Sequence, residues 1–241
     1  MTMKDIHTGK LLSAGMKMSE IPDIDPRLLG VIRRLGIRFG FGEHTVSEVC
    51  GASGINPYTL LLICKIYIYD NYIPSEEELS RTSVRDIVTY LHNSHDFYTG
   101  NALNALENGV RAMADSLDGR HEKIIMKFYS EYKDEILKHF DYEEKTVFPY
   151  ILGLDGGGRD GNGYNIDKYE EIHSDIDEKL NDLKSIVMKY MPATCDDNLI
   201  QNVLWQLYTL EYDLQKHTFI EDGILVPMVA SRERELRESG K

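Results

Sequence analysis

The feature that most limits how this chain can fold is a segment that occurs twice in similar form. "HFDYEEKTVFP" begins at His139, and "HTFIEDGILVP" begins 78 residues later at His217. Each places a glutamate four residues after the histidine and a proline six residues after the glutamate. Because residues i and i+4 of an α-helix share one face, roughly 6 Å apart, each segment can aim an imidazole and a carboxylate at one point.

Each segment is preceded at the same distance by another histidine. His95 lies 44 residues before His139, and His173 lies 44 residues before His217. The pattern indicates two helical hairpins, each carrying His and then His-x-x-x-Glu. Folded antiparallel with approximate two-fold symmetry, the hairpins would bring four histidines and two glutamates into one core.

Such a core needs cations, because buried carboxylates are costly unless they are paired or bound to metal. Mixed nitrogen and oxygen ligation suits iron, manganese or zinc. Two glutamates can bridge two metal ions while two histidines cap each ion. The predicted metal ligands are His95, His139, Glu143, His173, His217 and Glu221.

One ligand has an alternative in the sequence. "LHNSH" also offers His92, one turn before His95, and the 44-residue spacing favours His95. Metal-bound imidazoles usually donate their second N–H to a carboxylate or carbonyl. Glu135 and Asp213, each one turn before a predicted histidine ligand, are candidates for that role.

The fold predicted around these residues is all-α. Four long stretches, 83–117, 119–152, 165–191 and 195–229, have helical apolar spacing and favour an antiparallel four-helix bundle. A Ser75–Glu78 capping box follows a small helical region in which Thr45 and Asn56 are N-cap candidates. We therefore predict a small helical N-terminal domain over 1–76 and the metal-binding bundle over 77–241. The glycine-rich run at 153–165 lacks the Gly-Lys-Ser/Thr ending of a phosphate loop, so we expect a connection between helices.

Charge and cysteine content narrow the classes of partner. The net charge of −13 argues against nucleic acids and anionic membranes. The three cysteines are far apart and form no Cys-x-x-Cys pair, which favours reduced, buried thiols in a cytoplasmic protein. Neither a secretory signal nor a run of ~18 apolar residues is found.

With these residues in place, the chain resembles the hemerythrin-like (HHE) domain and, more narrowly, the bacterial repair-of-iron-centres di-iron proteins. The motifs that carry the resemblance are "HFDYEEKTVFP", "YEEIHSDID" and "HTFIEDGILVP". The resemblance implies that the four histidines are terminal ligands and that Glu143 and Glu221 bridge two non-haem iron ions. It also implies an oxo or hydroxo bridge, and O2 or NO as a small diatomic ligand.

The chain departs from that family in its N-terminal domain. Gly40 and Phe41 stand where the family has adjacent cysteines, so chemistry that needs this thiol pair is not expected. The leading hypothesis is a di-iron protein of the oxidative or nitrosative stress response that aids iron–sulfur cluster repair or binds O2 or NO. The alternative is a di-iron sensor that reports oxygen, NO or iron to a protein partner. No nucleophile or general-base constellation points to a classical enzyme. Iron–sulfur proteins and a second copy of the chain are the further candidate partners.

Overall fold

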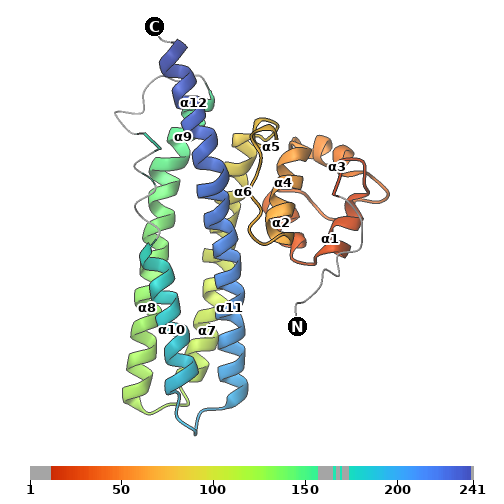
Figure 1. Cartoon of the computed structure of the whole chain (residues 1–241). Coiled ribbons are helices and arrows are strands. Elements are labelled where there is room, and N and C mark those ends of the chain that lie inside the picture. Colours follow the sequence, from red (N-terminus) through yellow and green to blue (C-terminus); the bar gives the residue numbers. More distant parts are fainter. Residues whose placement is uncertain (1–11, 157–164, 167–168, 170–173, 240–241) are drawn as a thin grey trace. The chain divides into compact units, whose positions relative to one another are not determined.

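The computed structural model describes residues 12–156, 165, 166, 169 and 174–239, and these residues are overwhelmingly helical (Figure 1). No strand occurs among them; an isolated antiparallel bridge joins Lys17 and Thr45. The prediction of an all-α fold is confirmed. The helical elements are η1 (Met18–Glu20), α1 (Ile21–Ile24), α2 (Leu28–Arg34), α3 (Val46–Ser53), α4 (Pro57–Ile68), α5 (Glu76–Ser80), α6 (Val84–Phe97), η2 (Tyr98–Ala102), α7 (Leu103–Ala114), α8 (Gly119–Tyr142), η3 (Glu143–Val147), α9 (Phe148–Asp155), α10 (Ser174–Tyr190), α11 (Asp197–Ile220), η5 (Glu221–Leu225) and α12 (Val226–Ser239).

The described chain divides into two compact units. One contains residues 12–93 and 220–232, and the other contains 94–219 and 233–239, as far as these ranges are described. The domain limit predicted between residues 76 and 77 remains a prediction. Most of the glycine-rich run, and His173, lie outside the described residues.

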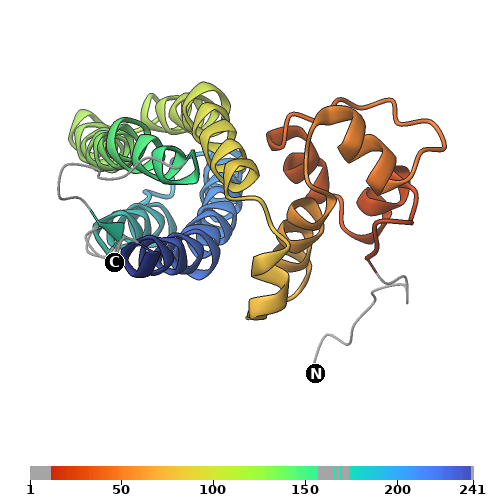
Figure 2. The ribbon, with the colours of Figure 1, turned by 90° about the horizontal axis from the view of Figure 1, so that it is seen from above.

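The second unit is built on α7, α8, α10 and α11, which lie side by side in both views (Figures 1 and 2). Short connections join α7 to α8 and α10 to α11 at the same end of the bundle, so each pair is antiparallel (Figure 1). Asp118 caps α8 by accepting hydrogen bonds from the backbone N–H groups of Arg120 and His121. The charged C-terminal stretch is helical as far as Ser239, where α12 ends.

The bundle core is one hydrophobic cluster to which all four helices contribute. Its residues recur at alternating three- and four-residue steps, which keeps them on one helical face. On α7 the series is Leu103, Leu106, Val110 and Met113. The series faces buried residues of the other helices, and this packing fixes the rotation of each helix about its axis.

Local capping explains the helix limits in the first unit. Thr45 accepts a hydrogen bond from the Glu48 N–H and Asn56 accepts one from the Tyr58 N–H, so both predicted N-caps are confirmed. Gly54 ends α3 with φ +70°, a conformation that residues with a Cβ rarely adopt.

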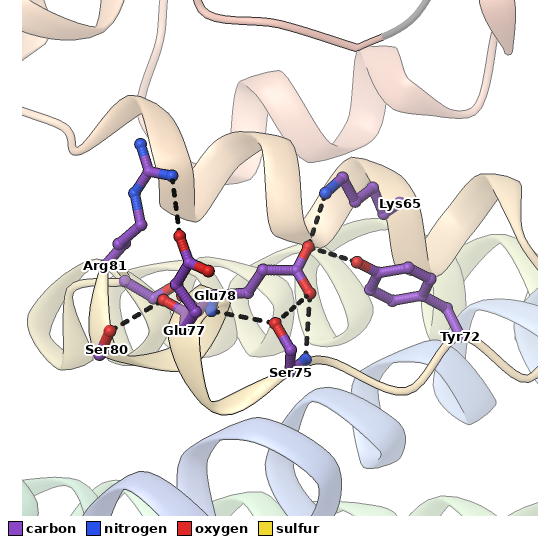
Figure 3. Close-up of polar contacts among 8 residues, drawn as sticks. Lys65, Tyr72, Ser75, Glu77, Glu78, Ser80 and Arg81 are labelled. Carbon is purple, nitrogen blue, oxygen red and sulfur yellow. Dashed lines mark hydrogen bonds and ion pairs between the residues drawn. The ribbon is translucent and has the colours of Figure 1, made fainter.

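The predicted capping box at the start of α5 is also present and extends into a wider polar cluster (Figure 3). The Ser75 hydroxyl accepts from the Glu78 N–H, and the Glu78 carboxylate accepts from the Ser75 N–H at 3.0 Å. Lys65 of α4 donates to Glu78 at 2.6 Å, and the Tyr72 hydroxyl donates to the same oxygen. Hydrogen bonds from Lys65, from the Ser75 backbone and from Tyr72 lower the pKa of Glu78 to about 2.

This carboxylate gives a prediction for acid stability. Because the folded-state pKa lies below the ordinary value of 4.5, the stabilisation is complete above about pH 4.5 and is lost as the pH falls toward about 2. Glu78→Gln is expected to lower the free energy of unfolding at pH 7 by about 1–2 kcal/mol, after allowance for solvent screening. Denaturant unfolding at pH 7 and pH 3 measures the free energy of unfolding of both proteins. The difference between Glu78→Gln and the wild type should be smaller at pH 3 than at pH 7.

Glu77→Gln is the matched control, because Glu77 is exposed and only approaches Arg81, at 3.9 Å. Its unfolding midpoint should stay close to that of the wild type. Equal midpoints for the two variants at pH 7 would contradict the role assigned to Glu78.

The cysteines are free and buried, as predicted. Burial raises the pKa of Cys50 to about 11 and also raises the pKa of Cys64. Within the described residues no single helix has the length and apolarity of a membrane span. The α3–α4 pair, bent by 117°, meets that test only when the two helices are taken together.

Candidate metal centre

The predicted ligands on two helices lie on the same buried face as the apolar core residues before them. Along each of these two stripes of residues the steps alternate between four and three residues, so the last two members continue the buried face of the apolar ones. On α8 and the start of η3 the stripe is Ile125, Tyr129, Tyr132, Ile136, His139 and Glu143. On α11 and the start of η5 it is Val203, Leu207, Leu210, Leu214, His217 and Glu221. The helical period that builds the core thus also points the histidines and glutamates inward.

Four of the predicted ligands come together in one buried group. His95, Glu143, His217 and Glu221 each offer a ligand atom, and these atoms all lie within 4.8 Å of one another. The Nε2 atoms of His95 and His217 face each other at 3.2 Å. Both glutamates are fully buried.

Glu143 lies between two histidines. Its Oε2 is 3.1 Å from the Nε2 of His95, and its Oε1 is 3.3 Å from the Nε2 of His139. The Tyr169 hydroxyl donates a hydrogen bond to the same Oε1. The two oxygens of one carboxylate therefore face two different imidazoles, which is the arrangement that a bridging carboxylate requires.

His95 is held in one orientation by its neighbours. Its Nδ1 is 2.7 Å from the Glu144 carboxylate, and its ring stacks on Phe140 at 4.1 Å and on Phe148 at 5.5 Å between ring centroids. An ionised carboxylate only accepts hydrogen bonds, so we assign the His95 proton to Nδ1. The Nε2 lone pair is then directed toward Glu143 and His217, as metal ligation requires.

A π-helical turn follows each described ligand helix. η2 begins three residues after His95, η3 begins at Glu143 and η5 begins at Glu221. Turns of this kind are rare and frequently occur at functional sites. Pro149 and Pro227, six residues after the two glutamates, lack an N–H and would clash with the carbonyl four residues earlier, so an ordinary α-helical turn cannot continue there. The repeated proline is therefore a sequence signal for η3 and η5, whereas η2 forms without one.

The remaining candidate residues of the site differ in burial and in their contacts. His95 is buried in the cluster whereas His92 is exposed on the same helix. Glu135, one candidate partner of His139, pairs instead with Lys138 and Lys179. Asp213 is half-buried. His173 lies outside the described residues.

Two contacts of the site had no counterpart in the sequence-based predictions. Glu144 holds His95 across 49 residues of chain, and Tyr169 reaches Glu143 across 26. For Glu144 the signal was the second glutamate of "YEEK", which immediately follows a predicted ligand. No local pattern identified Tyr169.

The donor set fits metal ions. Ligand atoms around one ion span about 4 Å when each lies about 2.0–2.2 Å from it, close to the spread of this group. Imidazole nitrogen and carboxylate oxygen together suit iron, manganese and zinc. A cation would also neutralise the buried carboxylates, which are costly to leave in an apolar interior.

Comparison with known proteins agrees with this geometry. A family model described as "Hemerythrin HHE cation binding domain" matches residues 87–229, which include all of the residues discussed for the site. The chain is also similar to the iron-sulfur cluster repair protein ScdA of Staphylococcus haemolyticus (strain JCSC1435). The two are 21% identical over 212 residues, covering 86% of this chain and 95% of that protein.

Proposed function

Because the chain belongs to the hemerythrin HHE cation-binding domain family, we propose that it is a non-haem di-iron protein of the oxidative or nitrosative stress response. The observation that carries the proposal is Glu143, whose two oxygens face His95 and His139 separately. One carboxylate in this position can join two metal ions. Manganese and zinc accept the same donors.

We assign His95, His139, His173 and His217 as terminal ligands and Glu143 and Glu221 as bridges. His95 and His217 present Nε2 atoms toward each other, and Glu144 keeps the His95 proton on the opposite side of the ring. The aromatic rings of Phe140, Phe148 and Tyr98 lie against the His95 and His217 imidazoles and exclude water from them. When bound, the metal pair would supply open coordination positions for a small diatomic ligand, O2 or NO, and a change of redox state.

The physiological role that we propose is help in restoring damaged iron–sulfur clusters. Its support is the similarity to ScdA, which covers most of both chains. Iron–sulfur proteins are then the expected partners. The free, buried cysteines are typical of the cytoplasm, which is the location we propose.

The test is to load the purified chain with iron under air and to measure iron content, absorption and cluster repair. We expect two iron ions per chain and charge-transfer absorption that changes when NO is added. The loaded chain should also speed recovery of an iron–sulfur enzyme inactivated by peroxide. A chain that takes up no iron and shows no such absorption would exclude the di-iron proposal. Iron uptake without an effect on the damaged enzyme would exclude only the repair role.

The choice between His92 and His95 as the metal ligand gives a separate prediction. His95→Ala is expected to lower the iron content by at least one ion per chain, because His95 contacts both Glu143 and His217. His92→Ala, three residues away on the same helix but exposed, should keep the wild-type content. Elemental analysis of both variants decides between them, and loss of iron only in His92→Ala would reverse the assignment.

One observation favours a second candidate function, a di-iron sensor. The helix that carries His95, α6, also carries Tyr90 and Asn93, which contact Arg34 of α2. Arg34 donates to the hydroxyls of Tyr67 and Tyr90 at 3.3 and 3.4 Å, and Asn93 donates to the Arg34 carbonyl at 2.6 Å. A change at His95 could therefore pass along α6. A partner captured only in one metal state would support the sensor, and a partner whose binding ignores the metal would oppose it.

A further inference from the structure

Tyr169 is a buried phenol in direct contact with the centre. Its side chain is fully buried, and its hydroxyl donates to Glu143 Oε1, the oxygen that also faces His139. A phenol at this place can fix which lone pair of the carboxylate oxygen remains for a metal ion. Partners of this kind set the orientation and basicity of metal ligands.

The segment that bears Tyr169 is anchored by a second buried carboxylate. Glu233 of α12 is 6% exposed, and its Oε1 accepts hydrogen bonds from the Ile166 N–H at 3.0 Å and from the Tyr150 hydroxyl at 2.6 Å. Arg237, one turn later on α12, pairs with the other oxygen of Glu233 at 3.1 Å.

A backbone hydrogen bond links this anchor to the phenol. The Tyr169 N–H donates to the Ile166 carbonyl at 2.9 Å, and the Ile166 side chain is itself fully buried. Glu233 therefore fixes Ile166, and Ile166 fixes the backbone of Tyr169. The phenol is thus held against Glu143 through Glu233 of α12, which Tyr150 of α9 supports, although Tyr169 itself is not in a helix.

We propose that Tyr169 is a positioning residue that orients Glu143 for the metal pair, and that Glu233 holds the segment carrying it. The proposal rests on the proposed di-iron function. We assign Tyr169 no ligand role in this arrangement, because its hydroxyl donates a hydrogen bond to the Glu143 carboxylate. Its loss should therefore weaken metal binding and alter the spectrum without removing a ligand.

The experiment compares Tyr169→Phe with Tyr129→Phe in the full chain. Tyr129 is the matched control, since it is also a buried tyrosine and donates one hydrogen bond, at 2.7 Å, to the Leu103 carbonyl away from the site. Metal affinity is measured by competition with a chelator, the iron-loaded centre by absorption, and the metal-free proteins by thermal unfolding. Tyr169→Phe should weaken metal affinity about 10–100-fold and shift the absorption, while Tyr129→Phe should do neither. Both should lower the metal-free melting temperature by similar amounts.

Three outcomes would overturn the assignment. Wild-type affinity and spectrum in Tyr169→Phe would show a purely structural role. A phenolate-to-iron absorption band that disappears in Tyr169→Phe would make Tyr169 a ligand instead. Failure of the wild-type chain to bind metal would overturn the di-iron proposal itself, which the other two outcomes leave standing.

Glu233→Gln provides an independent variant should Tyr169→Phe fail to fold. It keeps the side-chain length but weakens the anchor and the pair with Arg237, so affinity and spectrum should shift in the same direction by a smaller amount. The exposed Glu235, two residues later on α12, is its control as Glu235→Gln. Unchanged affinity and spectrum in Glu233→Gln would refute the anchoring role.

Discussion

Glu143→Ala is expected to abolish binding of the metal pair. This single carboxylate faces His95 with one oxygen, at 3.1 Å, and His139 with the other, at 3.3 Å. Its removal takes a ligand from both proposed metal positions at once, whereas loss of one histidine affects one position. The metal content, measured by elemental analysis after anaerobic loading, should fall from two ions per chain to below one. Glu221→Ala should behave in the same way, because Glu221 is the equivalent residue in the second segment.

The control for this variant is Glu135→Ala, two turns earlier on α8. Glu135 is partly exposed and pairs with Lys138 and Lys179, so its loss should leave the metal content unchanged. Two ions per chain retained in Glu143→Ala would refute the bridging role.

Metal removal is expected to destabilise the bundle strongly. Without a cation, two fully buried carboxylates remain in an apolar interior, where buried negative charge is costly. A ligand that binds only the folded state at about 1,000 times its dissociation constant stabilises it by about 4 kcal/mol. At about 2–4 °C per kcal/mol for a chain of this size, the melting temperature should fall by about 8–16 °C on chelation.

Calorimetry with and without chelator measures this effect. Because the chain has two compact units, two unfolding transitions can occur, and the response of each to chelator is measured separately. Glu143→Ala should show no response to chelator, which separates metal loss from general effects of the chelator. Equal melting temperatures for the loaded and chelated wild type would show that no structural metal is bound.

Local sequence patterns were sufficient to predict where several helices begin and which types of metal-binding side chain the core contains. The capping residues Thr45, Asn56 and Ser75 limit helices through contacts within three residues, so the sequence alone predicts them. The alternating steps from Ile125 to Glu143 likewise depend only on the helical period. They place an imidazole and a carboxylate on the face that the core must bury.

Contacts between distant segments could not be predicted in this way. Glu135 was a candidate partner of His139 because it lies one turn away, yet it pairs with Lys138 and Lys179. The carboxylate that does hold a histidine, Glu144, reaches His95 from another helix. The distinction between His92 and His95 likewise depended on which face of α6 is buried.

The sequence by itself determined that the chain is helical and that it carries two matching sets of imidazole and carboxylate donors. Helical period and donor chemistry are properties of neighbouring residues, so they can be read without coordinates. Only the tertiary structure decided that His95 meets His217 across 122 residues of chain and that Tyr169 reaches Glu143. Such contacts depend on how the packed side chains set the rotation and position of each helix, and no single segment contains that information.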